Sequence, residues 1–117
     1  MINELMKDKI VFISGKISGD DKFEEKFAQA ELKLRSYGCK VLNPAKLPQD
    51  LPYEKQMDIC FKFIDVSDYV YFLQDSIKSK GSTREKHYCE SKNKICLYDC
   101  GENKYLRTHE GRITMIE

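Results

Sequence analysis

The sequence predicts an α/β fold, a three-layer sandwich in which helices cover both faces of a parallel sheet. Short apolar runs rich in β-branched residues alternate with longer segments whose apolar residues recur at helical spacing. The connections between these segments are short, so each strand–helix–strand unit is expected to cross over and place its strands parallel. The 117 residues suffice for one domain of this kind, and we expect a single domain over residues 1–117.

The first half of the chain contains two predicted strands and one clear helix. Ile10–Ile13 is a continuous apolar run, which is typical of a strand buried on both faces. The next segment has one helical stripe, formed by Phe23, Phe27, Ala30, Leu34 and Tyr37. Gly38 is placed to end this helix. Residues 39–42 are a second short strand, which Asn43-Pro44 terminates.

The second half continues the same alternation. We expect a helix over 53–66, a strand over 69–73, a helix over 82–91 and a strand over 94–98. Residues 44–52 hold all three prolines and are predicted to form an ordered loop. Residues 113–116 are a candidate last strand, with Glu110-Gly111 as the turn before it. This order of elements indicates a flavodoxin-like parallel sheet of 4–5 strands.

Composition excludes several classes of partner. Lys+Arg is 20 and Asp+Glu is 19, so no basic field indicates nucleic acid or a membrane surface as a partner. No apolar run approaches the roughly 20 residues that span a bilayer. The five cysteines form no CxxC pair, and no export signal accompanies them, which favours reduced thiols in a cytoplasmic protein. A small molecule or another copy of the chain is the expected partner.

Two loops follow predicted strands at the edge of the sheet where ligands collect. The first contains Ser14, Gly15, Lys16, Ile17, Ser18 and Gly19. Its glycines allow close backbone approach, and the helix after it offers unpaired amides that suit a phosphate. A plain strand-to-helix turn would explain the same spacing. The second loop, Ser79–Glu85, places hydroxyls, Gly81 and a carboxylate at the start of a helix.

Glu85 has two interpretations. Ser82-Thr83-Arg84-Glu85 matches a capping box, in which Ser82 caps the helix and Glu85 bonds back to the Ser82 amide. In the other interpretation, Glu85 points into the cleft as a nucleophile or base. Asp58 and Asp68 are candidate supporting carboxylates, since two carboxyls about 5 Å apart permit glycosidic chemistry.

A zinc site is a further alternative. His87, Cys89, Cys96 and Cys100 supply enough ligands, but the usual zinc spacings are absent, and His87 and Cys89 face different sides of one helix. We expect no metal and no organic cofactor.

With these motifs in place, the chain resembles the nucleoside 2-deoxyribosyltransferase superfamily, and in particular its small, often phage-encoded members. The resemblance runs from Lys9 to about Tyr98. Its markers, in order, are Phe12–Gly19, Asn43-Pro44, Asp68–Tyr71, Ser79-Lys80-Gly81 and Glu85.

The resemblance implies that Glu85 attacks C1′ of a 2-deoxyribosyl group and displaces the base, after which water or a second base resolves the glycosyl-enzyme. It implies that residues 15–19 line the sugar or its 5′ end. It also implies that a serine at position 79 contacts phosphate, which favours a deoxynucleoside 5′-monophosphate as substrate. Relatives complete their sites with a neighbouring subunit, so a homo-oligomer (dimer or higher) is expected.

Two positions depart from the superfamily's pattern. Cys60 stands where an aspartate normally assists the leaving base, and Asp58 is the nearest carboxyl that could replace it. Phe12 stands where a tyrosine helps to orient the glutamate, and phenylalanine cannot donate a hydrogen bond.

Two functions follow from these observations. The first is hydrolysis or transfer at the N-glycosidic bond of a nucleotide, with Glu85 as nucleophile, Asp58 or Asp68 as supporting groups, and residues 15–19 with Ser79 and Ser82 as the phosphate cradle. The second is a non-catalytic nucleotide-binding protein that senses or sequesters a nucleotide-derived signal. A scaffold whose loops only cap helices is the third possibility.

Overall fold

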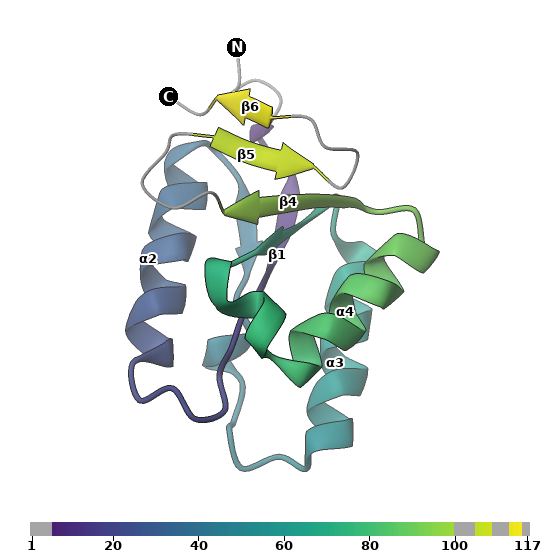
Figure 1. Ribbon diagram of the computed structural model, residues 1–117. Coiled ribbons are helices and arrows are strands. Elements are labelled where there is room, and N and C mark those ends of the chain that lie inside the picture. The colour runs from purple at the N-terminus through teal and green to yellow at the C-terminus, as the bar shows by residue number, and fades with distance from the viewer. Residues whose placement is uncertain (1–5, 100–104, 109–112, 116–117) are drawn as a thin grey trace.

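A computed structural model of the protein describes residues 6–99, 105–108 and 113–115 (Figure 1). One sheet runs through it with the strand order β2-β1-β3-β4-β5-β6. Its parallel strands are β1 (Ile10–Ser14), β2 (Lys40–Leu42), β3 (Tyr69–Phe72) and β4 (Ile95–Asp99). The order 2-1-3-4 is that of flavodoxin-like sheets, so the predicted fold class is confirmed.

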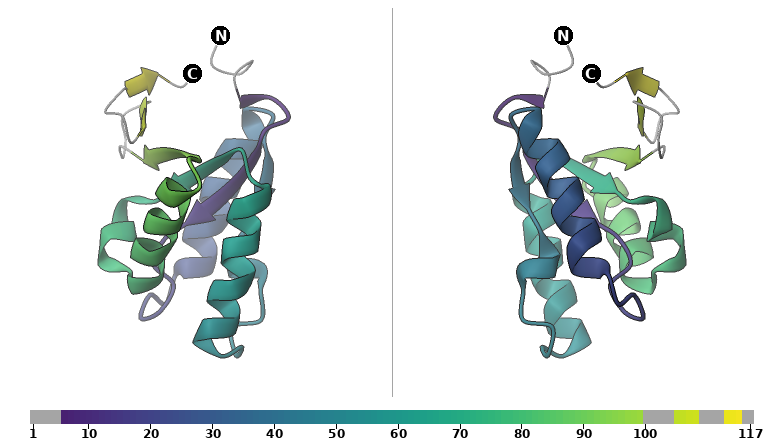
Figure 2. Two further views of the ribbon diagram at one scale, coloured as in Figure 1. Left: turned by 90° about the vertical axis from the view of Figure 1, so that its right-hand side faces the viewer. Right: turned by 90° about the vertical axis from the view of Figure 1, so that its left-hand side faces the viewer.

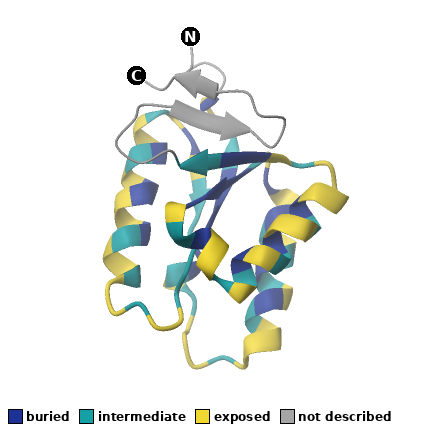
Figure 3. Ribbon diagram, viewed as in Figure 1, coloured by how far each residue is buried: buried dark blue, intermediate teal, exposed yellow. Residues whose placement is uncertain are grey.

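Three helices join the parallel strands and cover both faces of the sheet (Figure 2). They are α2 (Phe23–Ser36), α3 (Tyr53–Val66) and α4 (Lys80–Ser91). α2 buries Phe27 and Leu34 against one face, and α3 and α4 bury Ile64 and Cys89 against the other. Figure 3 shows the resulting pattern, with buried strands between helices whose outer faces are exposed. None of the described helices is long and apolar enough to cross a membrane.

The continuous apolar run in β1 follows from this two-sided burial. Val11 and Ile13 belong to the cluster on the α2 face, and Phe12 belongs to the cluster under α3 and α4. Ser14 continues the Phe12 side of the strand, because side chains alternate between faces. A hydroxyl is thereby placed under α4 at the carboxyl end of β1.

The sheet extends further than predicted. β5 (Tyr105–Thr108) pairs antiparallel with β4, and β6 (Ile113–Met115) pairs antiparallel with β5. The predicted last strand is therefore present, β5 was missed, and the proposed turn at residues 110–111 lies outside the described residues. Only residues 100–104 separate β4 from β5, fewer than the dozen or so that a parallel crossover needs, which explains the change of direction after β4.

The loop after β2 is held by a buried carboxylate on α2. It contains the short 3₁₀ helix η1 (Pro44–Lys46). Glu31 accepts hydrogen bonds from Nδ2 of Asn43 at 3.0 Å, Nε of Arg35 at 2.7 Å and Nζ of Lys46 at 3.2 Å. Burial acts to raise the pKa of Glu31, but these donors outweigh it and lower the pKa to about 2. The loop is thus ordered, as expected, by an interaction that the sequence pattern did not reveal.

Because the pKa of Glu31 is lowered, we expect the protein to lose stability in acid as this side chain becomes protonated. A lowered pKa means that the stabilisation is fully present above pH 4.5 and is lost as the pH falls toward 2. Allowing for the exposure of Arg35 and Lys46, we expect Glu31→Gln to cost about 2 kcal/mol near neutral pH. Urea denaturation should show this difference shrinking below pH 4.5. A constant difference down to about pH 2 would contradict the role of the charge.

Candidate active site

An open pocket of about 520 Å³ lies at the carboxyl ends of the parallel strands. Its volume suits a small molecule. The walls are the loop after β1, the loop after β2, helix α3 and the start of α4. The predicted site residues that line it are Gly15, Lys16, Ile17, Ser18, Ser79, Gly81 and Glu85. Two loops that are far apart in the sequence therefore meet at one cavity.

Glu85 reaches this pocket from the buried side of α4. Its side chain is only 6% exposed. The hydroxyl of Ser14 donates to Oε1 of Glu85 at 2.6 Å, and the thiol of Cys60 hydrogen bonds to the same carboxylate. Oγ of Ser82 lies 2.9 Å from Oγ of Ser14. Since Ser14 has one proton and gives it to the carboxylate, Ser82 donates to Ser14.

The capping-box interpretation of Glu85 is therefore wrong. The helix begins at Lys80, two residues before the predicted start, and Ser79 is its N-cap. Oγ of Ser79 accepts the Ser82 amide at 3.1 Å. Glu85 is then too far into the helix to act as a capping partner, and its side chain turns across to β1 instead.

Burial sets the acidity of Glu85. Removal from water raises its pKa from 4.5 to about 7, against the opposing effect of hydrogen bonds from Ser14 and Cys60. Near neutral pH the carboxyl is therefore present in both forms. Such a group can attack as a carboxylate or donate a proton as an acid, and a pKa moved this far in a pocket marks a candidate catalytic residue.

Ser14 and Ser82 were predicted to contact the ligand, but neither side chain reaches the pocket. Ser14 is fully buried and Ser82 is 2% exposed, and neither lines the cavity. Their hydroxyls support Glu85 from beneath. Gly19 is also outside the cavity; it lies in an exposed turn with φ of +79°, which explains the glycine without a ligand.

Asp58 and Asp68 are not brought to Glu85, so the prediction of a supporting carboxylate is wrong for both. Asp58 is exposed on α3, because two residues rotate a helix by roughly 200° and Cys60 takes the inward position. Asp68 precedes β3 and lies at the opposite end of the sheet, where its Oδ2 accepts the amide of Ile10 at 2.9 Å. Glu85 is the only carboxylate among the described residues that line the pocket.

The start of α4 is strongly positive. Lys78 and Lys80 line the pocket beside Ser79, and Lys16 lies on the opposing loop. The first turn of α4 has no acidic residue, whereas α2 places Glu24 and Glu25 in its first turn. Lys16 was predicted as a site residue, but Lys78 and Lys80 were not, although both flank Ser79 in the sequence.

Several backbone amides at this end are available to an anion. Ser79 satisfies the Ser82 amide, and within the described part of the chain no hydrogen bond uses the amides of Lys80 or Gly81. The amides of Ile17 and Ser18 on the facing loop are likewise without a partner there. Helix N-termini and loop amides of this kind bind phosphate groups.

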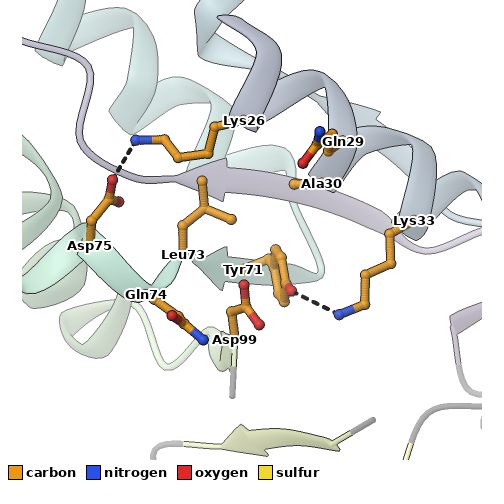
Figure 4. Close-up of a pocket in the computed structure, with 9 residues that line it drawn as sticks. All are labelled: Lys26, Gln29, Ala30, Lys33, Tyr71, Leu73, Gln74, Asp75 and Asp99. Carbon is orange, nitrogen blue, oxygen red and sulfur yellow. Dashed lines mark hydrogen bonds and ion pairs between the residues drawn. The ribbon is translucent and has the colours of Figure 1, made fainter. Parts of the chain in front are cut away.

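An ion pair between Lys26 and Asp75 stabilises the loop after β1. The amide of Lys16 donates to Oδ1 of Asp75 at 3.1 Å, and Nζ of Lys26 donates to the Lys16 carbonyl at 2.7 Å. Lys26 also pairs with Asp75, as Figure 4 shows. Lys26 and Asp75 border a second pocket, of about 410 Å³, on the α2 side of the sheet. There Nζ of Lys33 donates to the hydroxyl of Tyr71 at 3.3 Å. Because the Lys16 amide donates to Asp75, it is unavailable to a ligand.

In the described residues, no group of three or more His, Cys, Asp or Glu side chains comes together to hold a metal ion. Of the candidate zinc ligands, the thiols of Cys89 and Cys96 contact each other at 2.6 Å in the core. His87 is exposed on α4, and Cys100 lies outside the described residues.

Comparison with known proteins identifies a family. A family model described as a domain of unknown function (DUF4406) matches residues 9–98. No curated protein matches the chain. No solved structure matches it either. The matched region contains both loops, the cationic start of α4 and Glu85, and it covers most of the 117 residues, so the chain belongs to the DUF4406 family.

Proposed function

We propose that the protein cleaves, or transfers across, the N-glycosidic bond of a (deoxy)nucleoside 5′-monophosphate with Glu85 as the nucleophile. The observation that supports this most strongly is the position of Glu85, a buried carboxyl at the base of a pocket with a cationic rim. The resemblance to nucleoside 2-deoxyribosyltransferases gives the same role to this glutamate.

The charges of the pocket suit a phosphate monoester. Lys16, Lys78 and Lys80 supply three positive charges, and Glu85 supplies one negative charge when ionised, which leaves two positive charges. A phosphate monoester carries about −1.5 to −2 at neutral pH. The amides of Lys80 and Gly81, which no hydrogen bond among the described residues uses, add donors beside these ammonium groups. The phosphate would therefore bind at the rim and leave the sugar above Glu85.

The chemistry then takes two displacements. An oxygen of Glu85 attacks C1′, the bond from C1′ to the base nitrogen breaks, and the base leaves with that electron pair. Water, or the nitrogen of a second base, then attacks C1′ from the opposite side and releases the carboxylate. Two inversions give net retention. Ser14 holds the attacking carboxyl in place through its short hydrogen bond.

Protonation of the leaving base is the weak step in this site. Cys60 is the group beside Glu85, and burial raises the pKa of its thiol well above the usual value, so it is a poor proton donor. This observation favours a second candidate function, in which the pocket binds a nucleotide-derived signal without turning it over.

A panel of nucleosides and their 5′-monophosphates tests both functions. Chromatography should detect free base from one or more monophosphates with the wild type, and none with Glu85→Ala. Release that persists in Glu85→Ala would exclude Glu85 as the nucleophile. Calorimetric binding without release would support the binding function, and the absence of binding for every nucleotide would exclude both.

Gly81→Ala should separate binding from folding. A Cβ at Gly81 would lie 3.4 Å from Sδ of Met57 and 3.8 Å from the Tyr53 hydroxyl, which are ordinary contacts with pocket side chains. Alanine also favours the helix by up to about 1 kcal/mol. We expect an unchanged or higher Tm and roughly tenfold weaker nucleotide binding, because the methyl group enters the pocket.

Gly15→Ala is the contrasting variant, in which the added methyl group should affect folding. Its Cβ would lie 2.7 Å from Cδ1 of Leu73, so this glycine is required for packing beneath the loop. We expect that variant to lose about 1–3 kcal/mol of stability. Equal nucleotide affinity of Gly81→Ala and wild type would show that the ligand does not approach the start of α4.

A further inference from the structure

The wall of the pocket formed by α3 and the loop after β2 carries two glutamine side chains. Gln56 is half-buried on α3, and Gln49 lies in the loop after β2; both line the cavity. Pro44, Leu47 and Tyr53 add apolar and aromatic surface to the same wall. Nζ of Lys80 lies 5.7 Å from the centre of the Tyr53 ring, so an uncharged surface suited to a planar ring adjoins the cations of the pocket.

The two glutamine amides are fixed by their nitrogen atoms. Nε2 of Gln56 donates to the carbonyl oxygens of Leu51 at 3.0 Å and Gln49 at 3.3 Å. Nε2 of Gln49 donates to the carbonyl oxygens of Leu47 at 2.6 Å and Pro44 at 3.4 Å. A carbonyl oxygen can only accept, so these contacts determine which end of each amide is nitrogen.

The amide oxygens are the groups left for a ligand. No hydrogen bond among the described residues uses Oε1 of Gln56 or Gln49. Because both side chains are anchored to loop carbonyls, they cannot turn an N–H toward the pocket without breaking those bonds. The wall therefore offers acceptors and no free side-chain amide donors to a bound base.

We infer that Gln56, with Gln49 beside it, is a specificity-determining residue that selects bases presenting an exocyclic amino group. Adenine and cytosine offer N–H donors to these oxygens. Hypoxanthine and uracil place a carbonyl oxygen at the same position, where it would face an acceptor. This inference rests on the proposed function, because the phosphate must bind at the lysine rim for the base to reach the glutamine wall.

Matched pairs of 5′-monophosphates test the selection by calorimetry. The probes are the adenine and hypoxanthine nucleotides and the cytosine and uracil nucleotides, in ribo and deoxy forms. The protein carries Glu85→Gln, so that binding is measured without turnover. We expect the amino member of at least one pair to bind about tenfold or more tightly, since one lost hydrogen bond and one acceptor clash separate the two. Affinities equal within about twofold in both pairs would overturn the inference.

Variants at position 56 show whether the glutamine oxygen makes the selection. Gln56→Met, added to the same protein, should bring the ratio close to one, mainly by weakening the amino nucleotide. Gln74→Met, which alters an exposed glutamine of the other pocket, is the control and should leave the ratio unchanged. An unchanged ratio in Gln56→Met would overturn the assignment.

The two proposals fail separately. A strong amino preference in binding, with no base release by the wild-type protein, would exclude the glycosidic function and leave the selection by Gln56 standing. Base release at equal rates from both members of each pair, with equal affinities, would exclude the selection and leave the glycosidic function standing.

Discussion

Glu85→Gln is expected to reduce base release by at least about 10³-fold and, at the same time, to stabilise the fold at alkaline pH. Glutamine keeps the shape of the side chain and can still accept the Ser14 hydroxyl, but it is not a nucleophile. It also removes a charge that burial makes unfavourable, since the pKa of Glu85 is raised to about 7. The gain in stability should be on the order of 3 kcal/mol at about pH 8.

The stabilisation by Glu85→Gln grows with pH within a defined window. A carboxyl whose pKa is raised on folding contributes its full stability below 4.5, and this stability is lost as the pH rises through about 7. Wild type and Glu85→Gln should therefore be equally stable near pH 4.5 and diverge above it. Urea denaturation at several pH values measures the divergence. Should the variant be the less stable protein at about pH 8, the carboxylate would be stabilised by contacts beyond those described.

The same titration predicts the pH dependence of activity. Attack on C1′ requires the ionised carboxylate, so kcat/KM should rise with pH through about 7 and then level off. In the proposed mechanism, the ionised state of Glu85 that attacks C1′ is thus the state that destabilises the fold. Such a conflict between stability and activity is typical of a catalytic group.

The fold was largely predictable because its signals are local. The stripe on α2 and the apolar run of β1 follow from helical periodicity and two-sided burial, and α3 begins at Tyr53 and ends at Val66 as predicted. The predicted start of α4 was two residues too late, because both Ser79 and Ser82 are good N-caps and the local sequence does not distinguish them. Tertiary contacts distinguish the two serines: Ser82 is buried against Ser14, and Ser79 is left as the N-cap.

The site was predictable only in part, because its geometry depends on contacts between distant segments. Both loops were found from glycine and hydroxyl content, yet Ser14 and Ser82 were assigned to the ligand when they support Glu85 instead. Asp68 was predicted to be a supporting carboxylate, although it lies at the opposite end of β3 from the pocket. Cys60 was recognised as a departure, but only the structure shows it against Glu85.

Ser14→Ala is expected to lower activity at neutral pH and to move the activity profile toward higher pH. The Ser14 hydroxyl donates to the Glu85 carboxylate at 2.6 Å and so lowers the pKa of Glu85 against the effect of burial. Without it the pKa rises further, and a smaller fraction of Glu85 is ionised at pH 7. A hydrogen bond to a charged group contributes about 1.5–3 kcal/mol, so kcat/KM should fall by roughly 10–100-fold there.

The shape of that profile distinguishes positioning from a general packing defect. If Ser14 acts through Glu85, much of the lost activity should return as the pH is raised, because the carboxylate forms again. Ser82→Ala should cause a smaller shift in the same direction, since Ser82 supports Ser14 and not Glu85 itself. Ser18→Ala, at an exposed hydroxyl on the pocket wall, should leave the apparent pKa unchanged. Equal loss of activity at every pH in Ser14→Ala would show that the hydroxyl serves packing alone. The orienting donor on β1 is then Ser14, two residues beyond Phe12 on the same face of the strand, because phenylalanine at position 12 has no hydroxyl to give.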